Sequence, residues 1–141
     1  MGLEGYRFPG GEYRISAAEN EALCAAVGVS PDPGGRAHPI FYYIATQVAM
    51  GLGVGDLLAL CDFDVADGPM MTGSEVTFDE DLIVDRTYRV DGEIVSLVRK
   101  PSRAFGTADT LRFRLSLAAE GRTVASVVNE WILPRGKEAA Q

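Results

Sequence analysis

The chain has 141 residues, 47% of them apolar, which fits one compact domain with a full hydrophobic core. Its formal net charge of −7 and its pI near 4.6 disfavour nucleic acid or an anionic membrane surface as a partner, because both would repel it. We therefore expect residues 1–141 to form a single domain with one functional site.

Neither a targeting segment nor a membrane span is expected. Residues 1–11 carry charged and turn residues in place of a long apolar core, and no apolar run approaches the roughly 20 residues that cross a bilayer. We expect a soluble cytoplasmic protein. Its two cysteines, Cys24 and Cys61, lack metal-type spacing, and a reducing compartment keeps them as thiols in the core.

The N-terminal part predicts a short strand followed by a small helix. Polar and apolar residues alternate over 12–15, as in a half-buried strand. Ser16 stands three residues before Glu19, which is the spacing of a capping box. The helix that follows is expected over 17–27, because Gly28 is a natural helix terminator.

A loop then leads to the only histidine of the chain. Residues 30–36 contain two prolines and two glycines, so they form neither helix nor strand. His38 follows, immediately before Pro39, and proline is favoured at the first position of a helix. The apolar run over about 39–51 therefore predicts a long central helix, buried on most sides, with His38 at its positive end.

Four β-rich stretches separated by turn signals follow the central helix, with one further short helix expected near 56–61. The strands are expected near 71–78, 87–98, 105–118 and 123–133. Turn-forming residues at 90–92, 101–103 and 119–121 predict an antiparallel meander for the last three strands. The predicted fold class is α+β, with one antiparallel sheet wrapped around the central helix.

Four segments carry a family resemblance. They are Tyr13-Arg14-Ile15-Ser16 before the first helix, Ala37-His38 at the start of the central helix, the strand 73–78, and the last strand ending at 130–135. In this order they resemble the MaoC-like hydratase/dehydratase family, which has the hot-dog fold. The resemblance covers most of the chain and implies a protein that handles acyl thioesters of coenzyme A or of an acyl carrier protein.

Active members of that family add water to a 2-enoyl thioester, or remove it from a 3-hydroxyacyl thioester, without a cofactor or metal. Their carboxylate and imidazole come from a Gly-Asp-x-Asn-Pro-x-His segment after the first helix. Here Val29 stands in place of the acid, and no histidine follows until His38. Pro39 occupies the position of a glycine whose N–H meets the thioester carbonyl, and proline has no N–H. The resemblance therefore implies a degenerate site.

The candidate catalytic residues are His38, as a general base, and Asp32, as the acid that acts with it; the alternative is an acid from a partner chain. The plainer interpretation makes His38 a hydrogen-bonding residue at a helix start and Asp32 a turn residue. Candidate substrate-binding residues at the helix start are Ile40 and Phe41, through free first-turn amides, and Tyr42. Three basic residues near the 101–103 turn, Arg99, Lys100 and Arg103, are candidates for binding the phosphates of a carrier.

Several functional hypotheses remain open. The chain is predicted to be a catalytically silent MaoC-like subunit in fatty-acyl, steroid or polyketide metabolism, paired with itself or with another hot-dog subunit. The alternative is an active hydratase that uses His38 in a rearranged site. A thioesterase or acyl-thioester binding protein is a weaker alternative, because residues 39–51 hold no carboxylate. The acidic stretches 62–64 and 79–81 are interpreted as solvated loops, since no calcium-type loop accompanies them.

Overall fold

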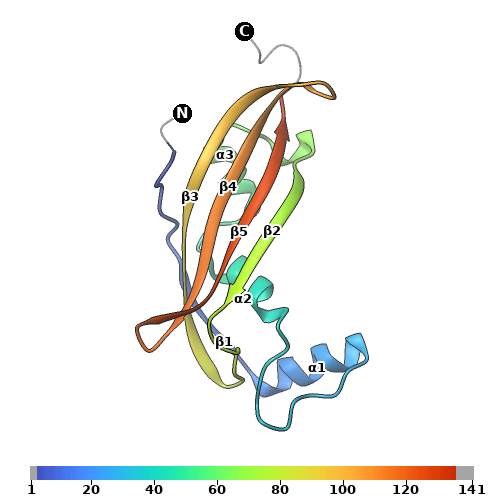
Figure 1. Cartoon of the computed structure of the whole chain (residues 1–141), viewed down its shortest axis with the longest axis vertical. Helices are drawn as coiled ribbons and strands as arrows, with labels where there is room; N and C mark the ends of the chain where they lie inside the picture. The colour runs from blue at the N-terminus through green and yellow to red at the C-terminus, as the bar shows by residue number, and fades with distance from the viewer. Residues whose placement is uncertain (1–2, 136–141) are drawn as a thin grey trace.

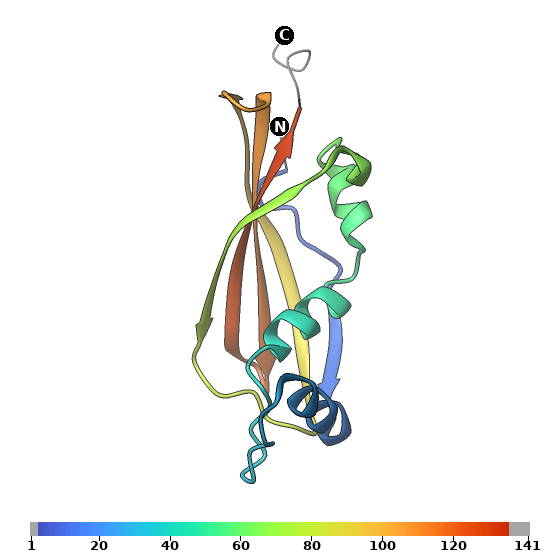
Figure 2. The same ribbon diagram turned by 90° about the vertical axis from the view of Figure 1, so that its right-hand side faces the viewer.

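Five strands form one antiparallel sheet in the order β1-β3-β4-β5-β2 (Figure 1), in a computed structural model that describes residues 3–135. The elements are β1 (Gly11–Ile15), α1 (Ala17–Val27), α2 (Phe41–Ala49), α3 (Val54–Leu60), a 3-10 turn (Val65–Asp67), β2 (Met70–Phe78), β3 (Arg86–Ser102), β4 (Gly106–Ala119) and β5 (Arg122–Pro134). The helices lie on one side of the sheet (Figure 2), so the predicted α+β class is confirmed.

The β3-β4-β5 meander is confirmed, but one of its three expected turns is wrong. Residues 90–92 lie inside β3, paired with 115–117 of β4. A Cβ on Gly92 would come within 2.6 Å of Leu115 Cδ2 and 2.7 Å of Phe8 Cδ2. Gly92, which has no side chain, therefore lets Phe8 and Leu115 pack against β3. The turn-forming residue types at 90–92 do not form a turn here.

Helix α1 forms where its caps predict it. The N–H of Glu19 donates to the Ser16 hydroxyl at 3.0 Å, and Gly28 ends the helix with a φ of 79°. A residue with a Cβ rarely adopts that left-handed conformation. The amide side chain of Asn20 and the thiol of Cys24, both on this helix, are buried against the rest of the protein.

Helix α2 is shorter than the expected range 39–51. Its first residues form turns, because the N–H groups of Phe41 and Tyr42 donate to the carbonyls three residues earlier, those of His38 and Pro39. Gly51, with a φ of 91°, ends the apolar run. The expected short helix is confirmed as α3. Among residues 3–135 no single helix is long and apolar enough to span a membrane; α2 and α3 meet that length only as a pair bent by 63°.

The core lies between α2 and strands β1, β3 and β4. Helix α2 contributes Phe41, Ala45 and Ala49, each at most 8% exposed. The expected burial on most sides does not extend to the outer face of this helix, where Tyr43 is 39% and Val48 68% exposed. An apolar helix face therefore remains uncovered within this chain.

Candidate functional site

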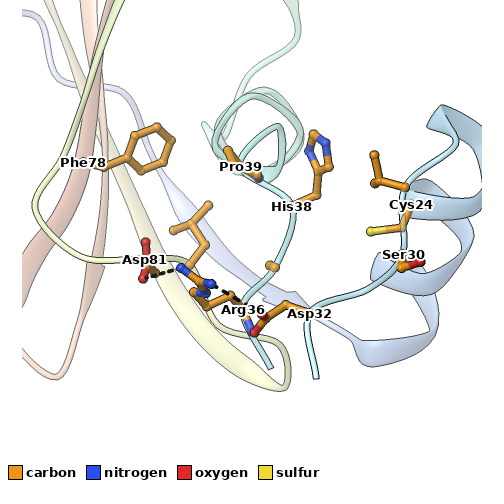
Figure 3. Close-up of a pocket in the computed structure, with 11 residues that line it drawn as sticks. Cys24, Ser30, Asp32, Arg36, His38, Pro39, Phe78 and Asp81 are labelled. Carbon is orange, nitrogen blue, oxygen red and sulfur yellow. Dashed lines mark hydrogen bonds and ion pairs between the residues drawn. The ribbon is translucent and has the colours of Figure 1, made fainter. Parts of the chain in front are cut away.

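A pocket of about 340 Å³ lies between α1, the segment that precedes α2, and the end of β2 (Figure 3). The two candidate catalytic residues, His38 and Asp32, both line it. Its other lining residues are Cys24, Val29, Ser30, Arg36, Ala37, Pro39, Phe78, Asp81 and Leu82. The structure thus brings the predicted pair into one cavity.

The imidazole of His38 is tied into the turn before α2. Its Nδ1 accepts the N–H of Ile40 at 3.1 Å. This bond uses the lone pair of Nδ1 and leaves Nε2 as the nitrogen that can meet a ligand. The backbone N–H of His38 donates to Asn20 Oδ1 at 2.8 Å. His38 is therefore held from both sides, by α1 and by the first turn of α2.

Asn20 is a residue of this site that sequence reasoning missed. It is 3% exposed, and its Oδ1 accepts both the His38 N–H and, at 3.8 Å, the Cys24 thiol. A buried asparagine in the middle of a helix is the one available signal, because such a side chain needs partners. The identity of those partners depends on the path of the loop that returns to α1.

Asp32 stabilises the loop that leads to His38. Its Oδ2 accepts the backbone N–H of Arg36 at 3.1 Å, and the Arg36 guanidinium lies 3.4 Å from Oδ1. These hydrogen bonds, the backbone one first, lower the pKa of Asp32. Arg36 also pairs with Asp81 at 3.7 Å. Figure 3 shows the His38 ring pointing away from the Asp32 carboxylate, so the two groups share a pocket without forming a dyad.

The expectation that Ile40 and Phe41 present free amides is wrong. The Ile40 N–H donates to His38 Nδ1, and the Phe41 N–H donates to the His38 carbonyl at 3.1 Å. The ring of Tyr42 packs edge-on against Phe78 of β2, with centroids 5.9 Å apart. Tyr42 thus links α2 to the residue that closes one side of the pocket.

The structure does not bring the three basic candidates to this pocket. Arg99 and Lys100 lie near the end of β3 and Arg103 in the turn between β3 and β4. This turn lies at the end of the sheet opposite α1 (Figure 1). The Arg99 guanidinium holds Asp109, with Nε 2.7 Å from Oδ1 and Nη2 3.1 Å from Oδ2. Within this chain Arg99 has a structural ion pair, far from His38.

Asp109 is the centre of a buried ion cluster that the sequence did not reveal. It is fully buried and also meets Arg135 Nε at 2.9 Å. Burial alone would raise the pKa of Asp109, but the hydrogen bonds and charges of Arg99 and Arg135 outweigh burial and lower it. Arg135 further donates to the carbonyls of Cys61 and Asp62. The cluster therefore joins β3, β4 and β5 to the end of α3.

Both cysteines are buried free thiols, as expected for core residues. Burial raises the pKa of Cys61 to about 11. In residues 3–135 no group of three or more His, Cys, Asp or Glu side chains is arranged to hold a metal ion.

No family model matches this chain, and no curated protein matches it in sequence. Among solved structures, it is similar to the ChsH1-ChsH2 complex of Mycobacterium tuberculosis, with a TM-score of 0.72, 18% identity, and coverage of 93% of this chain and 86% of that one. A MaoC-like dehydratase from Rhodospirillum rubrum gives a TM-score of 0.67 at 17% identity, covering 94% and 92%.

The HadBC 3R-hydroxyacyl-ACP dehydratase complex of Mycobacterium tuberculosis also has a TM-score of 0.67, at 16% identity, covering 94% and 98%. A thioesterase from Thermus thermophilus, solved with coenzyme A and zinc, has a TM-score of 0.57 at 16% identity, covering 92% and 82%. Identities this low establish the fold and leave the activity open. The chain has the hot-dog fold, and the predicted resemblance is confirmed at that level.

Proposed function

We propose that this hot-dog chain is a MaoC-like subunit of a cytoplasmic 2-enoyl hydratase or 3-hydroxyacyl dehydratase, in which it is the catalytically degenerate partner of an active hot-dog subunit. Its role is to complete the acyl-thioester site of that subunit. The proposal rests on how the groups at the start of α2 are already bonded.

The observation that carries the proposal is the bond between His38 and Ile40. Hydration of an enoyl thioester needs a base for water and an N–H donor for the carbonyl oxygen. In this chain one candidate donor, the Ile40 N–H, is bonded to Nδ1 of the candidate base. The position before it holds Pro39, which has no N–H.

Asp32 adds to this interpretation. Its carboxylate holds the Arg36 backbone and side chain, and it points away from the imidazole (Figure 3). An acid that orients its own loop is poorly placed to manage the protons of a bound water. This arrangement supports a degenerate site, because the reaction uses a carboxylate and an imidazole together.

Two uncovered surfaces support pairing with a second subunit. The edge strand β2 has eight exposed residues of nine, and α2 exposes Tyr43 and Val48. Two of the similar structures are described as complexes, ChsH1-ChsH2 and HadBC, and one thioesterase was solved with coenzyme A. These likenesses favour a hot-dog partner and a coenzyme A thioester as ligand.

A second candidate is an active hydratase that uses His38 in a rearranged site. It is favoured by one observation: Nε2 of His38 has no hydrogen-bond partner among residues 3–135, and His38 lines the pocket. A thioesterase is less well supported, since α2 carries no carboxylate to activate water.

The decisive experiment is hydration of a panel of 2-enoyl-CoA esters, followed by loss of enoyl absorbance. It compares the purified chain, its His38→Ala variant, and each of them mixed with each candidate active hot-dog subunit encoded in the same genome. The matched control is Glu21→Ala, at an exposed site of α1 away from the pocket.

The proposal predicts activity only in the mixtures, at the same rate with His38→Ala as with the unchanged chain. Turnover by the chain alone that is lost in His38→Ala, and kept in Glu21→Ala, would establish the active hydratase instead. Hydrolysis to free coenzyme A, detected with a thiol reagent, would establish the thioesterase.

A further inference from the structure

Strand β2 forms one open edge of the sheet. Strand β2 pairs with β5 on one side only, and its apolar residues Met71 and Phe78 are 45% and 41% exposed. An edge strand offers a row of backbone N–H and C=O groups that another strand can pair with. An exposed edge of this kind, with apolar side chains along it, is suited to a strand from a second chain.

The charge along this edge has one sign. From Pro39 to Asp85 the chain holds nine carboxylates and no Lys, Arg or His, so the remainder of the chain has a net positive charge. Asp67 lies just before β2, Glu75 lies on it and Asp79 follows it; we call these three residues the acidic edge. All three are exposed, and in the described part of the chain none of them has an ion-pair partner.

A second copy of this chain would meet that edge with the same charges. Every strand pair in the sheet is antiparallel, so a second β2 would align its Phe78 end with the Met70 end of the first. Asp79 of each copy would then approach Asp67 of the other, at both ends of the paired strands.

The middle of the strand has the same conflict. Pairing centred on Ser74 would set the two Glu75 side chains diagonally across the junction, on one face of the joined sheet. Diagonal neighbours lie about 7–8 Å apart, which is inside the screening length of about 10 Å at 0.1 M salt. Like charges at this separation oppose self-pairing.

We propose that the β2 edge binds a strand of a different hot-dog chain, one that presents Lys or Arg toward the acidic edge, and that it rejects a second copy of this chain. The proposal rests on the proposed function for the presence of a hot-dog partner. It adds the chemistry by which that partner is selected. A basic strand is attracted to the acidic edge, and a second copy of this chain is repelled by it.

The position of Phe78 gives this choice a functional meaning. Phe78 ends β2 and also lines the His38 pocket. A strand that pairs with β2 therefore lies beside the wall of that pocket, where it can contribute side chains to it. Selection of the partner and completion of the site occur at the same place.

The test uses a charge-reversed copy of this chain as the probe. The copy carries Asp67→Lys, Glu75→Lys and Asp79→Lys. Among residues 3–135, these three carboxylates make no side-chain hydrogen bond or ion pair that the substitutions would remove. Its control carries Glu4→Lys, Glu12→Lys and Glu21→Lys, which change the net charge equally at exposed sites outside β2. Circular dichroism checks that each variant is folded.

Sedimentation equilibrium at low and at high NaCl concentration measures association of the chain with itself, with the reversed copy and with the control copy. The reversed copy is expected to bind at least about tenfold more tightly than a second unchanged chain at low salt, with the difference shrinking at high salt. The control copy is expected to bind no more tightly than the unchanged chain.

A second variant keeps the test independent of the reversal. Glu75→Gln with Asp79→Asn removes the repulsion and is expected to strengthen self-association. Self-association of the unchanged chain that equals its binding to the reversed copy, or that ignores salt and this neutral variant, would overturn the proposal. Because no substrate is used, turnover by the chain alone would refute the proposed function and leave this result unaffected.

Discussion

The backbone N–H of Ile40 donates to Nδ1 of His38 at 3.1 Å, so the only imidazole of the chain is bonded within the turn that precedes α2. The same bond removes a donor and a ring nitrogen from any chemistry at that helix end. It leaves Nε2 as the ring nitrogen of His38 without a hydrogen bond among residues 3–135.

The hydrogen bond from Ile40 to His38 gives a first prediction about stability. His38→Ala is expected to lower the free energy of unfolding by about 1 kcal/mol, because the Ile40 N–H loses its acceptor. His38→Asn keeps a side-chain acceptor of similar reach and is expected to lose less. Urea unfolding followed by circular dichroism measures both values. Equal losses in the two variants would show that the hydrogen bond does not support the fold.

A second prediction concerns Asn20, which connects α1 to the same turn. Asn20→Ala leaves the His38 N–H without its acceptor and is expected to cost about 1–3 kcal/mol. Amide hydrogen exchange gives the specific signature, since the His38 N–H should exchange faster while the amides of β4 keep their protection. Glu21→Ala, exposed on the same helix, is the control and should stay within about 0.5 kcal/mol.

The buried cluster around Asp109 gives the third prediction. Asp109→Asn removes the carboxylate that compensates the charge of Arg135. It is expected to destabilise the protein by about 3 kcal/mol or more. Glu130→Gln is the comparison, because its contact with Arg112 is 3.8 Å long and exposed. A loss for Asp109→Asn as small as that for Glu130→Gln would contradict the role assigned to the cluster.

The same cluster also sets a dependence on pH. The folded pKa of Asp109 is lowered, so the unfolded chain binds its proton more readily. The stability from this group is thus complete well above the unfolded pKa of about 3.9 and is lost as the pH falls through the folded value. Unfolding measured from neutral to strongly acidic pH should show a smaller acid-induced loss in Asp109→Asn than in the unchanged chain.

The fourth prediction concerns thiol reactivity. Because the pKa of Cys61 is raised to about 11 and both cysteines are buried, neither thiol should react quickly with Ellman's reagent at mildly alkaline pH in the folded protein. Both thiols should react at once in concentrated urea. Rapid reaction of one thiol in the absence of urea would show that one of these sites opens readily.

Local signals explain most of what could be predicted from the sequence. Ser16 and Gly28 define α1 because caps act within a few residues. The alternation in β4 gives its buried face, and the positions of the last three strands follow. Gly92 shows the limit of such signals. A glycine is needed there because Phe8 and Leu115 approach from distant parts of the chain.

The site was less predictable for the same reason. His38 stands out as the only histidine, immediately before the proline of the central helix, and Asp32 lies in the loop that leads to it; the structure places both in one pocket. Their hydrogen bonds to Ile40 and Arg36 are also local, but only the fold determines where the two side chains point. Asn20 and Asp109 act through partners 18 and 26 residues away, at distances where sequence patterns carry no information.

Arg135, which follows β5, makes contacts that limit how this side of the chain can be altered. Its guanidinium reaches Asp109, lies 5.2 Å from the ring centre of Phe63, and holds the carbonyls after α3. A purification tag, a fused protein or a truncation on this side should therefore leave the Arg135 side chain intact. Removal of the Arg135 side chain would take away the hydrogen bonds that tie the carbonyls of Cys61 and Asp62 to the buried carboxylate of Asp109, while Leu57 and Leu58 would still hold α3 in the core.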